Sequence, residues 1–147
     1  MTKLWSETIA QARSLVENET DRVANAANVC ALLKERFGWW WVGVYYVDST
    51  TDTLVLGPFQ GPVACTRIPF GRGVCGTCWQ RRESIVVPDV ELFPGHIACS
   101  SLSRSEIVVP VFVPDGSVKA VLDIDSDKLD AFDDDDKSAL EEIAKLL

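Results

Sequence analysis

The segment from Ser105 to Asp125 constrains the fold more than any other, because two apolar runs flank the residues PDGS. Proline and glycine placed in this way are typical of a tight turn between antiparallel strands. The pattern therefore predicts strands over residues 105–113 and 118–125 that pair as a hairpin. Such a pair must bury at least one face, so the chain is expected to build a sheet against a core.

Carboxylates interrupt this hairpin at regular positions. If Val113 pairs with Val118 across the turn, Glu106 lies opposite Asp125, and Asp123 follows on the same face. Like charges that face each other destabilise a sheet, so the cluster calls for an explanation. It could bind a cationic group such as an amine, with one carboxyl kept protonated to act as an acid. Alternatively, the three side chains lie on a solvated face.

The rest of the chain contains helical and strand patterns in separate blocks. Apolar residues at helical spacing predict helices at both ends, whereas β-branched and aromatic runs predict strands between them. This order indicates a single α+β domain over residues 1–147. Helices are expected over residues 2–18, 21–37 and 133–147, with a short one near 73–82, and strands over residues 39–47, 53–59, 64–69 and 84–87, besides the hairpin.

Charge and hydropathy exclude several classes of protein. The net charge of −8 argues against binding to nucleic acid or to anionic membranes, because both require basic patches. No apolar run approaches the roughly 18 residues of a membrane span. The N-terminal residues also lack the continuous apolar stretch of a signal peptide. A cytoplasmic protein is therefore expected.

Five cysteines are many for a cytoplasmic chain of this length. Cys75 and Cys78 form a C-x-x-C pair, which is typical of a redox dithiol or of half a zinc site. Cys30 lies on the apolar side of a predicted helix and is expected in the core. His96 either lowers the pKa of Cys99 or holds a loop by hydrogen bonds. Any further zinc ligands would have to come from Cys65, Cys99 or His96.

Cys99 precedes Glu106 by seven residues, on the path into the carboxylate face. A thiolate beside an acid suits attack on an electrophile whose oxygen must be protonated. A sulfoxide is such an electrophile, although a zinc site would use many of the same residues.

Five segments of the chain resemble the free methionine-(R)-sulfoxide reductases, a family with the GAF fold. This family has three cysteines spaced by ten and then twenty-four residues, as are Cys65, Cys75 and Cys99 here. The resemblance implies an antiparallel sheet of about six strands with the N- and C-terminal helices packed on one face. The segments are WVGVYYV (41–47), LVLGPFQGPVACTRIPFGRGVCGT (54–77), VVPDVELFPGHIAC (86–99), SEIVVPV (105–111) and LDIDS (122–126).

The resemblance also implies roles for the cysteines. The Cys99 thiolate would attack the sulfoxide sulfur of free methionine-(R)-sulfoxide, release methionine and become a sulfenic acid. Cys65 would then condense with this sulfenic acid to a disulfide, and Cys75 would serve as an auxiliary thiol. Thioredoxin or a similar dithiol protein would reduce the disulfide. The family usually has a small residue other than cysteine at the position of Cys78.

By the same resemblance, Glu106, Asp123 and Asp125 hold the substrate ammonium and protonate the sulfoxide oxygen. Trp41 matches an aromatic residue that packs against the methyl end of the substrate. Buried carboxylates that bind a free ammonium would reject peptide-bound methionine sulfoxide, whose nitrogen carries no charge.

The resemblance implies a homodimer formed through the helices, no bound cofactor or metal, and a part in the response to oxidative stress. Two other interpretations stay open from the residues. One is a GAF domain that senses a small ligand without chemistry. The other is a structural zinc domain with Cys65, Cys75, Cys78 and Cys99 as ligands.

Overall fold

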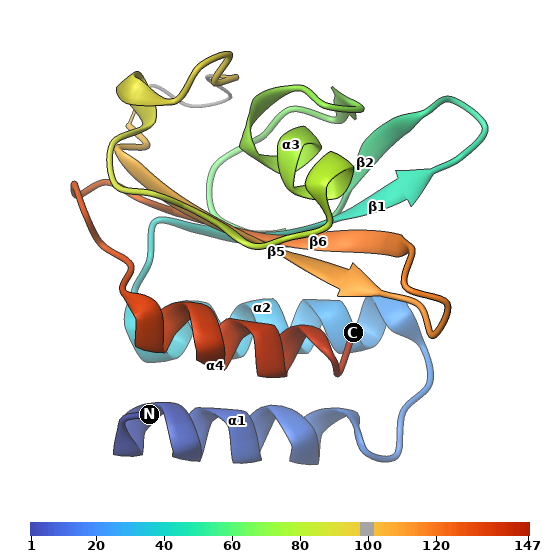
Figure 1. The fold of residues 1–147 in the computed structure, drawn as a ribbon. Coiled ribbons are helices and arrows are strands. Elements are labelled where there is room, and N and C mark those ends of the chain that lie inside the picture. Colours follow the sequence, from blue (N-terminus) through green and yellow to red (C-terminus); the bar gives the residue numbers. More distant parts are fainter. Residues whose placement is uncertain (98–101) are drawn as a thin grey trace.

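The computed structural model describes residues 1–97 and 102–147, and it has a six-stranded antiparallel sheet at its centre (Figure 1). The strand order is β3-β2-β1-β6-β5-β4. Helices α1, α2 and α4 lie on one side of the sheet and α3 on the other (Figure 1). The prediction of an α+β fold with both terminal helices on one face is confirmed. The elements are α1 (Lys3–Val16), α2 (Arg22–Phe37), β1 (Trp41–Asp48), β2 (Thr53–Gln60), β3 (Arg67–Pro69), α3 (Gly73–Arg81), β4 (Ile85–Val87), a 3₁₀ helix (Val90–Leu92), β5 (Ser105–Phe112), β6 (Val118–Ser126) and α4 (Asp134–Ala144).

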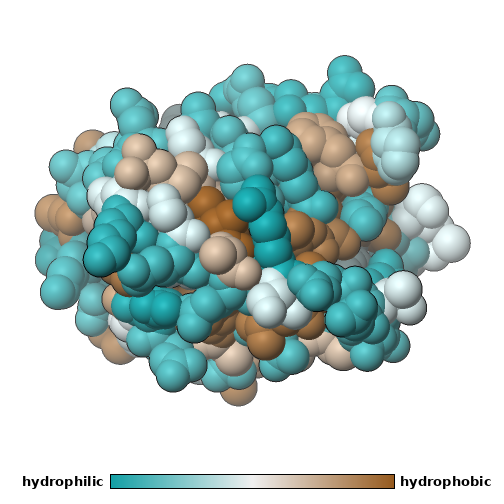
Figure 2. All heavy atoms as spheres, turned by 90° about the horizontal axis from the view of Figure 1, so that it is seen from below, coloured by the Kyte–Doolittle hydropathy of each residue, from teal (hydrophilic) through white to brown (hydrophobic). Residues whose placement is uncertain are grey.

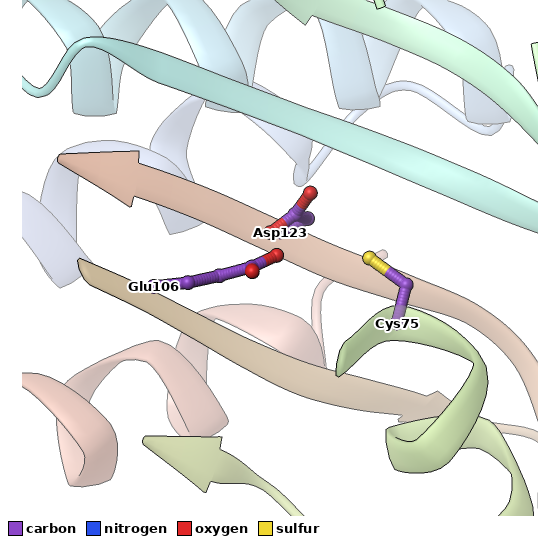
Figure 3. Close-up of side chains that lie close together, drawn as sticks. All are labelled: Cys75, Glu106 and Asp123. Carbon is purple, nitrogen blue, oxygen red and sulfur yellow. The ribbon is translucent and has the colours of Figure 1, made fainter. Parts of the chain in front are cut away.

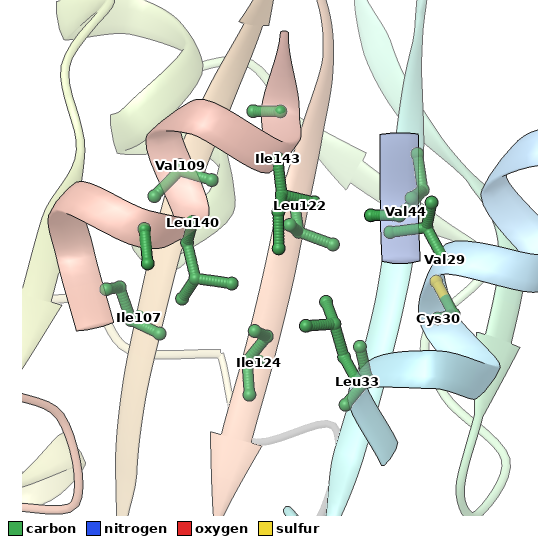
Figure 4. Packing of buried hydrophobic residues seen from close by; sticks show 14 of the residues in the cluster. Val29, Cys30, Leu33, Val44, Ile107, Val109, Leu122, Ile124, Leu140 and Ile143 are labelled. Atoms are coloured by element: carbon green, nitrogen blue, oxygen red, sulfur yellow. The ribbon is translucent and has the colours of Figure 1, made fainter. Parts of the chain in front are cut away.

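The main core lies between the sheet and helices α2 and α4, and α1 packs outside these two helices (Figure 1). Figure 4 shows aliphatic side chains from both helices meeting those of β1, β5 and β6. Helix α2 begins where the Asp21 side chain accepts a hydrogen bond from Ala24 N, and it ends at Gly38 in the left-handed conformation.

The outer surface of the helical layer is largely hydrophilic, with hydrophobic patches near its middle (Figure 2). Leu4, Leu15 and Val23 are the exposed large aliphatic side chains of α1 and α2. In the part of the chain that the structure describes, no helix is long and apolar enough to cross a membrane.

The β5–β6 hairpin has the predicted register along its length, although the pairing nearest the turn differs from the prediction. Glu106 pairs with Asp125 as expected, but Val118 pairs with Phe112 and not with Val113. The PDGS turn has Gly116 in a left-handed conformation, and a bulge after Val111 restores the expected register. The change of pairing at the turn and the bulge therefore cancel, and Glu106 still pairs with Asp125.

The three consecutive tryptophans separate at the start of β1. The strand begins at Trp41, two residues later than predicted, because Trp39 belongs to the helical core. The Trp39 ring stacks on Phe37, with ring centroids 4.4 Å apart. Trp41 lies on the other face of the sheet, in a second hydrophobic cluster below α3. Trp39 precedes the strand, so the alternation of β1 does not apply to it, and the two tryptophans can lie in different layers.

Candidate active site

A pocket lies above the sheet on the α3 side, opposite the helical core. Its volume is about 550 Å³, which includes the space open to solvent. Strands β1, β5 and β6 form its floor, and α3 and two connecting segments form its walls. Its lining residues are Trp40, Trp41, Tyr45, Val63, Ala64, Ile68, Gly73, Val74, Cys75, His96, Ile97, Ser103, Glu106, Asp123 and Asp125.

The three carboxylates of the hairpin all face this pocket, as the alternation predicted. Glu106 and Asp123 retain only 5% and 6% of their accessible surface, so the interpretation as a solvated face is wrong. Asp125 is partly exposed and accepts a hydrogen bond from Ser103 Oγ at 3.1 Å. The hairpin therefore presents a buried acidic cluster to the pocket.

Burial and mutual repulsion disfavour the ionised form of these carboxyls when no cation is bound. Burial raises the pKa of Glu106 to about 8, and the charge of Asp125 adds to this rise. Burial likewise raises the pKa of both Asp123 and Asp125, each with a further contribution from a neighbouring carboxylate. A cation in the pocket would favour the ionised forms, so the cluster is suited to bind one.

The described residues provide the cluster with few hydrogen-bond donors and little positive charge. Among them, none donates a hydrogen bond to Asp123 Oδ1, which is fully buried. Among the described residues, His96 is the one basic side chain in contact with the cluster, with Nε2 3.7 Å from Glu106 Oε1. Burial lowers the pKa of His96, so its positive charge is disfavoured at neutral pH. His96 therefore lies against Glu106 rather than acting only on its own loop.

Cys75 brings a thiol into the same cluster from helix α3 (Figure 3). Its Sγ and one oxygen each from Glu106 and Asp123 all lie within 4.8 Å of one another. Burial raises the pKa of this thiol well above its usual value, and the charge of Asp123 adds to the effect. The side chain is buried, so the pocket is the side from which a small molecule would reach it.

Aromatic side chains from β1 close one side of the pocket and hold the loop between β2 and β3. Trp41 Nε1 donates to the carbonyl of Pro62 at 3.0 Å. The Tyr45 hydroxyl donates to the carbonyl of Cys65 at 2.8 Å. Sequence reasoning proposed Trp41 but not Tyr45, although their spacing of four residues on one strand face is a usable signal. Together they fix the backbone that carries Cys65 beside the pocket.

The remaining cysteines lie in three settings. Cys30 is fully buried in the helical core, as predicted. Cys78 is also fully buried, with Sγ 3.8 Å from the Val108 carbonyl, which favours a packing role over a redox one. Cys65 is half-buried in the segment between β2 and β3. Cys99, the predicted nucleophile, lies outside the described residues.

The alternative interpretation, a zinc site with four cysteine ligands, includes Cys99, and its other three cysteines form no metal-binding group within residues 1–97 and 102–147. In that part of the chain, Cys75, Glu106 and Asp123 are the one group of three potential ligands close enough to hold an ion. Neither Cys65 nor Cys78 belongs to this group.

Comparison with known proteins places this fold and pocket in a defined family. A family model described as GAF domain matches residues 19–147. The chain is 57% identical to the free methionine-R-sulfoxide reductase from Neisseria meningitidis, whose structure was solved in complex with its substrate. That superposition covers 99% of this chain and 88% of the other, with a TM-score of 0.95.

Two further relatives are similar in sequence over nearly the whole chain. The free methionine-R-sulfoxide reductase of Escherichia coli is 44% identical over 99% of this chain and 87% of its own length. GAF domain-containing protein A of Dictyostelium discoideum is 56% identical over 97% of this chain and 89% of its own length. With its fold, its pocket and these similarities taken together, the chain belongs to the free methionine-R-sulfoxide reductases, a family of oxidoreductases built on the GAF domain.

Proposed function

We propose that this protein reduces free L-methionine-(R)-sulfoxide to L-methionine. The observation that carries the proposal is the cluster of Glu106, Asp123 and Asp125, which lines one pocket and of which the first two side chains are buried. A substrate ammonium would supply the positive charge that the cluster lacks. The similarity to reductases whose names specify the free amino acid supports the same substrate.

The chemistry assigned to the chain divides into two thiol steps. Cys99 attacks the sulfoxide sulfur, the oxygen passes to the cysteine as a sulfenic acid, and methionine leaves. The Cys65 thiol then attacks the sulfenic acid, so that a disulfide forms and water is released. A dithiol protein of the thioredoxin type returns both cysteines to thiols, which closes the cycle.

Several features of the pocket support this assignment. Ile97, two residues before Cys99 in the sequence, lines the pocket, and Ser103, four residues after Cys99, lines it as well. Glu106, with a pKa raised to about 8, can remain protonated at neutral pH and donate a proton to the sulfoxide oxygen. Trp41 offers an aromatic wall for the methylthio group.

Turnover of the two sulfoxide epimers with dithiothreitol as reductant tests the proposal. We expect activity on free L-methionine-(R)-sulfoxide, and none on the (S)-epimer or on an N-acetylated substrate. Activity on the N-acetylated form would leave the thiol chemistry in place but contradict the role of the carboxylates. A lack of turnover by fully reduced protein would favour a ligand-sensing GAF domain.

Cysteine variants test the thiol steps separately. We expect Cys99→Ser to abolish turnover, and Cys65→Ser, reduced beforehand and then freed of added reductant, to release one methionine per chain before the cycle stops. Cys78→Ser is the matched control, because it removes a buried thiol outside the pocket and can keep the contact to the Val108 carbonyl. Turnover by Cys99→Ser at the wild-type rate would contradict the assignment of the nucleophile.

The homodimer is proposed from the family resemblance, and the cytoplasmic location from the charge and hydropathy of the sequence. Light scattering of the purified chain tests the first, and fractionation of cells that express it tests the second. We expect a mass of twice 16.2 kDa. Leu4, Leu15 and Val23 are exposed on the helical layer, where the dimer interface is proposed.

A further inference from the structure

Three potential metal-ligand atoms converge in the pocket from three different elements (Figure 3). They are the Sγ of Cys75 on α3 and a carboxylate oxygen each from Glu106 on β5 and Asp123 on β6, all within 4.8 Å of one another. Zinc in a tetrahedral site, with bonds of about 2.0 to 2.3 Å, holds its ligand atoms roughly 3.3 to 3.8 Å apart. Movement of these side-chain atoms by about an ångström would therefore complete three bonds.

An independent feature points to a cation at this position. Asp123 retains 6% of its accessible surface, and within the described chain its Oδ1 has no hydrogen-bond donor. A buried carboxylate oxygen left in this state raises the free energy of the folded protein. A positive ion bound to that oxygen would remove this cost.

His96 lies beside this group of three atoms without belonging to it, and its ring would have to shift toward them to become the fourth ligand. Its Nε2 lies 3.7 Å from Glu106 Oε1, on the pocket side of the cluster. One sulfur, one imidazole nitrogen and two carboxylate oxygens form a donor set that favours zinc or cobalt over magnesium or calcium, which prefer oxygen alone.

We propose that the reduced protein binds one divalent cation of the zinc class through Cys75, Glu106 and Asp123, with His96 as the fourth ligand. The ion occupies the place that the proposed function gives to the substrate ammonium, so it inhibits the enzyme by competition. This second part rests on the proposed function, whereas binding of the ion does not.

An ammonium and a zinc ion differ in whether they need the sulfur atom of Cys75. An ammonium needs hydrogen-bond acceptors, and the carboxylates provide them without Cys75. A zinc ion gains most from a thiolate ligand. Removal of the Cys75 sulfur therefore weakens metal binding selectively, and Cys78, one turn further along α3 and outside the cluster, offers a matched control.

Calorimetric titration of the untagged, full-length protein with zinc chloride tests the site, under anaerobic conditions with a phosphine reductant. We expect about one ion per chain, as for other sites of this kind. Cys75→Ser should weaken binding by at least about tenfold, because even changes outside the ligand set can have that effect. Cys78→Ser should bind as the wild type does.

Titration with cobalt chloride gives a second measurement that does not depend on activity. A thiolate ligand produces a charge-transfer absorption band, which we expect in the wild type and in Cys78→Ser but not in Cys75→Ser. Asp123→Asn keeps the shape of the side chain and should weaken zinc binding while the band from Cys75 persists at higher cobalt concentration. It also provides a test if Cys75→Ser does not fold.

Competition separates this proposal from the proposed function. Free L-methionine should lower the apparent zinc affinity, and N-acetyl-methionine should not. Wild-type affinity for zinc in Cys75→Ser, or no binding at all by reduced protein that turns over substrate, would overturn the metal site and leave the reductase intact. Zinc binding that requires Cys75, in a protein without reductase activity, would support the site and contradict the proposed function.

Discussion

At the residue scale, the position of the Trp41 ring depends on the absence of a side chain at Gly43. A Cβ atom at that position would lie 2.3 Å from Cη2 of Trp41 and 2.7 Å from the Cβ of Phe59. We therefore expect Gly43→Ala to displace the ring from the pocket wall. The change should weaken methionine binding and lower the free energy of unfolding by about 1 to 3 kcal/mol.

Calorimetric binding of methionine and thermal unfolding together check this expectation. Gly38→Ala is the matched control, because Gly38 has a positive φ of 67° and an added Cβ there would meet nothing within 4 Å. It should lower stability through backbone strain at the end of α2, with methionine affinity unchanged. Equal methionine affinity in both variants would show that the ring is not part of the binding site.

The raised pKa of Glu106 predicts how the free energy of unfolding depends on pH. Glu106 has a folded pKa of about 8 against about 4.5 in the unfolded chain, so the folded protein binds more protons between these values. Stability from this group is fully present below about pH 4.5 and is lost as the pH rises through about 8. We expect a loss on the order of 5 kcal/mol across this window.

Thermal denaturation of the ligand-free protein from pH 5 to pH 8 measures this loss. Glu106→Gln should show a shallower decline, since the glutamine does not titrate. A wild-type stability that increases over the same range would contradict the raised pKa. Saturating methionine should also flatten the decline, because its ammonium favours the ionised carboxylates.

Sequence patterning predicted which residues of the hairpin face the pocket but not how deeply they are buried. Alternation alone assigns Glu106 and Asp123 to one face. Their burial depends on α3 and on the loop near Val63, which cover that face and are connected to the hairpin only through the tertiary fold. The contact between His96 and Glu106 was missed for the same reason.

At the scale of elements, the β5–β6 hairpin shows why a register is easier to predict than a turn. The apolar faces of both strands must match the helical core, which selects the pairing of Glu106 with Asp125. The pairing at Val118 depends instead on the left-handed conformation of Gly116 and on the bulge after Val111. Neither feature has a periodic signal in the sequence.

Helix α4 begins with a capping box that makes a prediction of its own. The Asp133 side chain accepts a hydrogen bond from Asp136 N, and the Asp136 side chain accepts one from Asp133 N. Asp136 also accepts from Trp5 Nε1 at 2.9 Å, which ties α4 to α1. We expect Asp133→Ala to lower the free energy of unfolding by about 1 kcal/mol.

Chemical denaturation measures this change, with Asp134→Ala as the control. Asp134 lies in the same acidic first turn and is exposed, so its removal should cost only about a few tenths of a kcal/mol. Identical midpoints for the two variants would contradict the importance of the capping box. Neither variant should change turnover, since α4 lies across the sheet from the pocket (Figure 1).

At the scale of the whole molecule, the pocket should couple ligand binding to global stability. The three acidic side chains come from the neighbouring strands β5 and β6, so an ammonium that bridges them favours the folded state. Free methionine at 100 times its dissociation constant should stabilise the protein by about 2.7 kcal/mol, or on the order of 10 °C in Tm.

Thermal shift at pH 8 compares free methionine with its N-acetylated form. We expect a shift for the first and none for the second, since only the first carries an ammonium. Asp123→Asn should reduce the shift, whereas Asp134→Ala should preserve it. Equal shifts for the two ligands would mean that recognition does not depend on the amine.

Along strand β6, side chains that pack in the hydrophobic core alternate with side chains that line the pocket. Leu122 and Ile124 point into the helical core, and Asp123 and Asp125 point into the pocket. Alternate positions of one strand can therefore diversify independently of their neighbours. A combinatorial library restricted to positions 123 and 125, with 122 and 124 held constant, should yield mostly folded proteins and give a route to retarget this scaffold toward other small molecules.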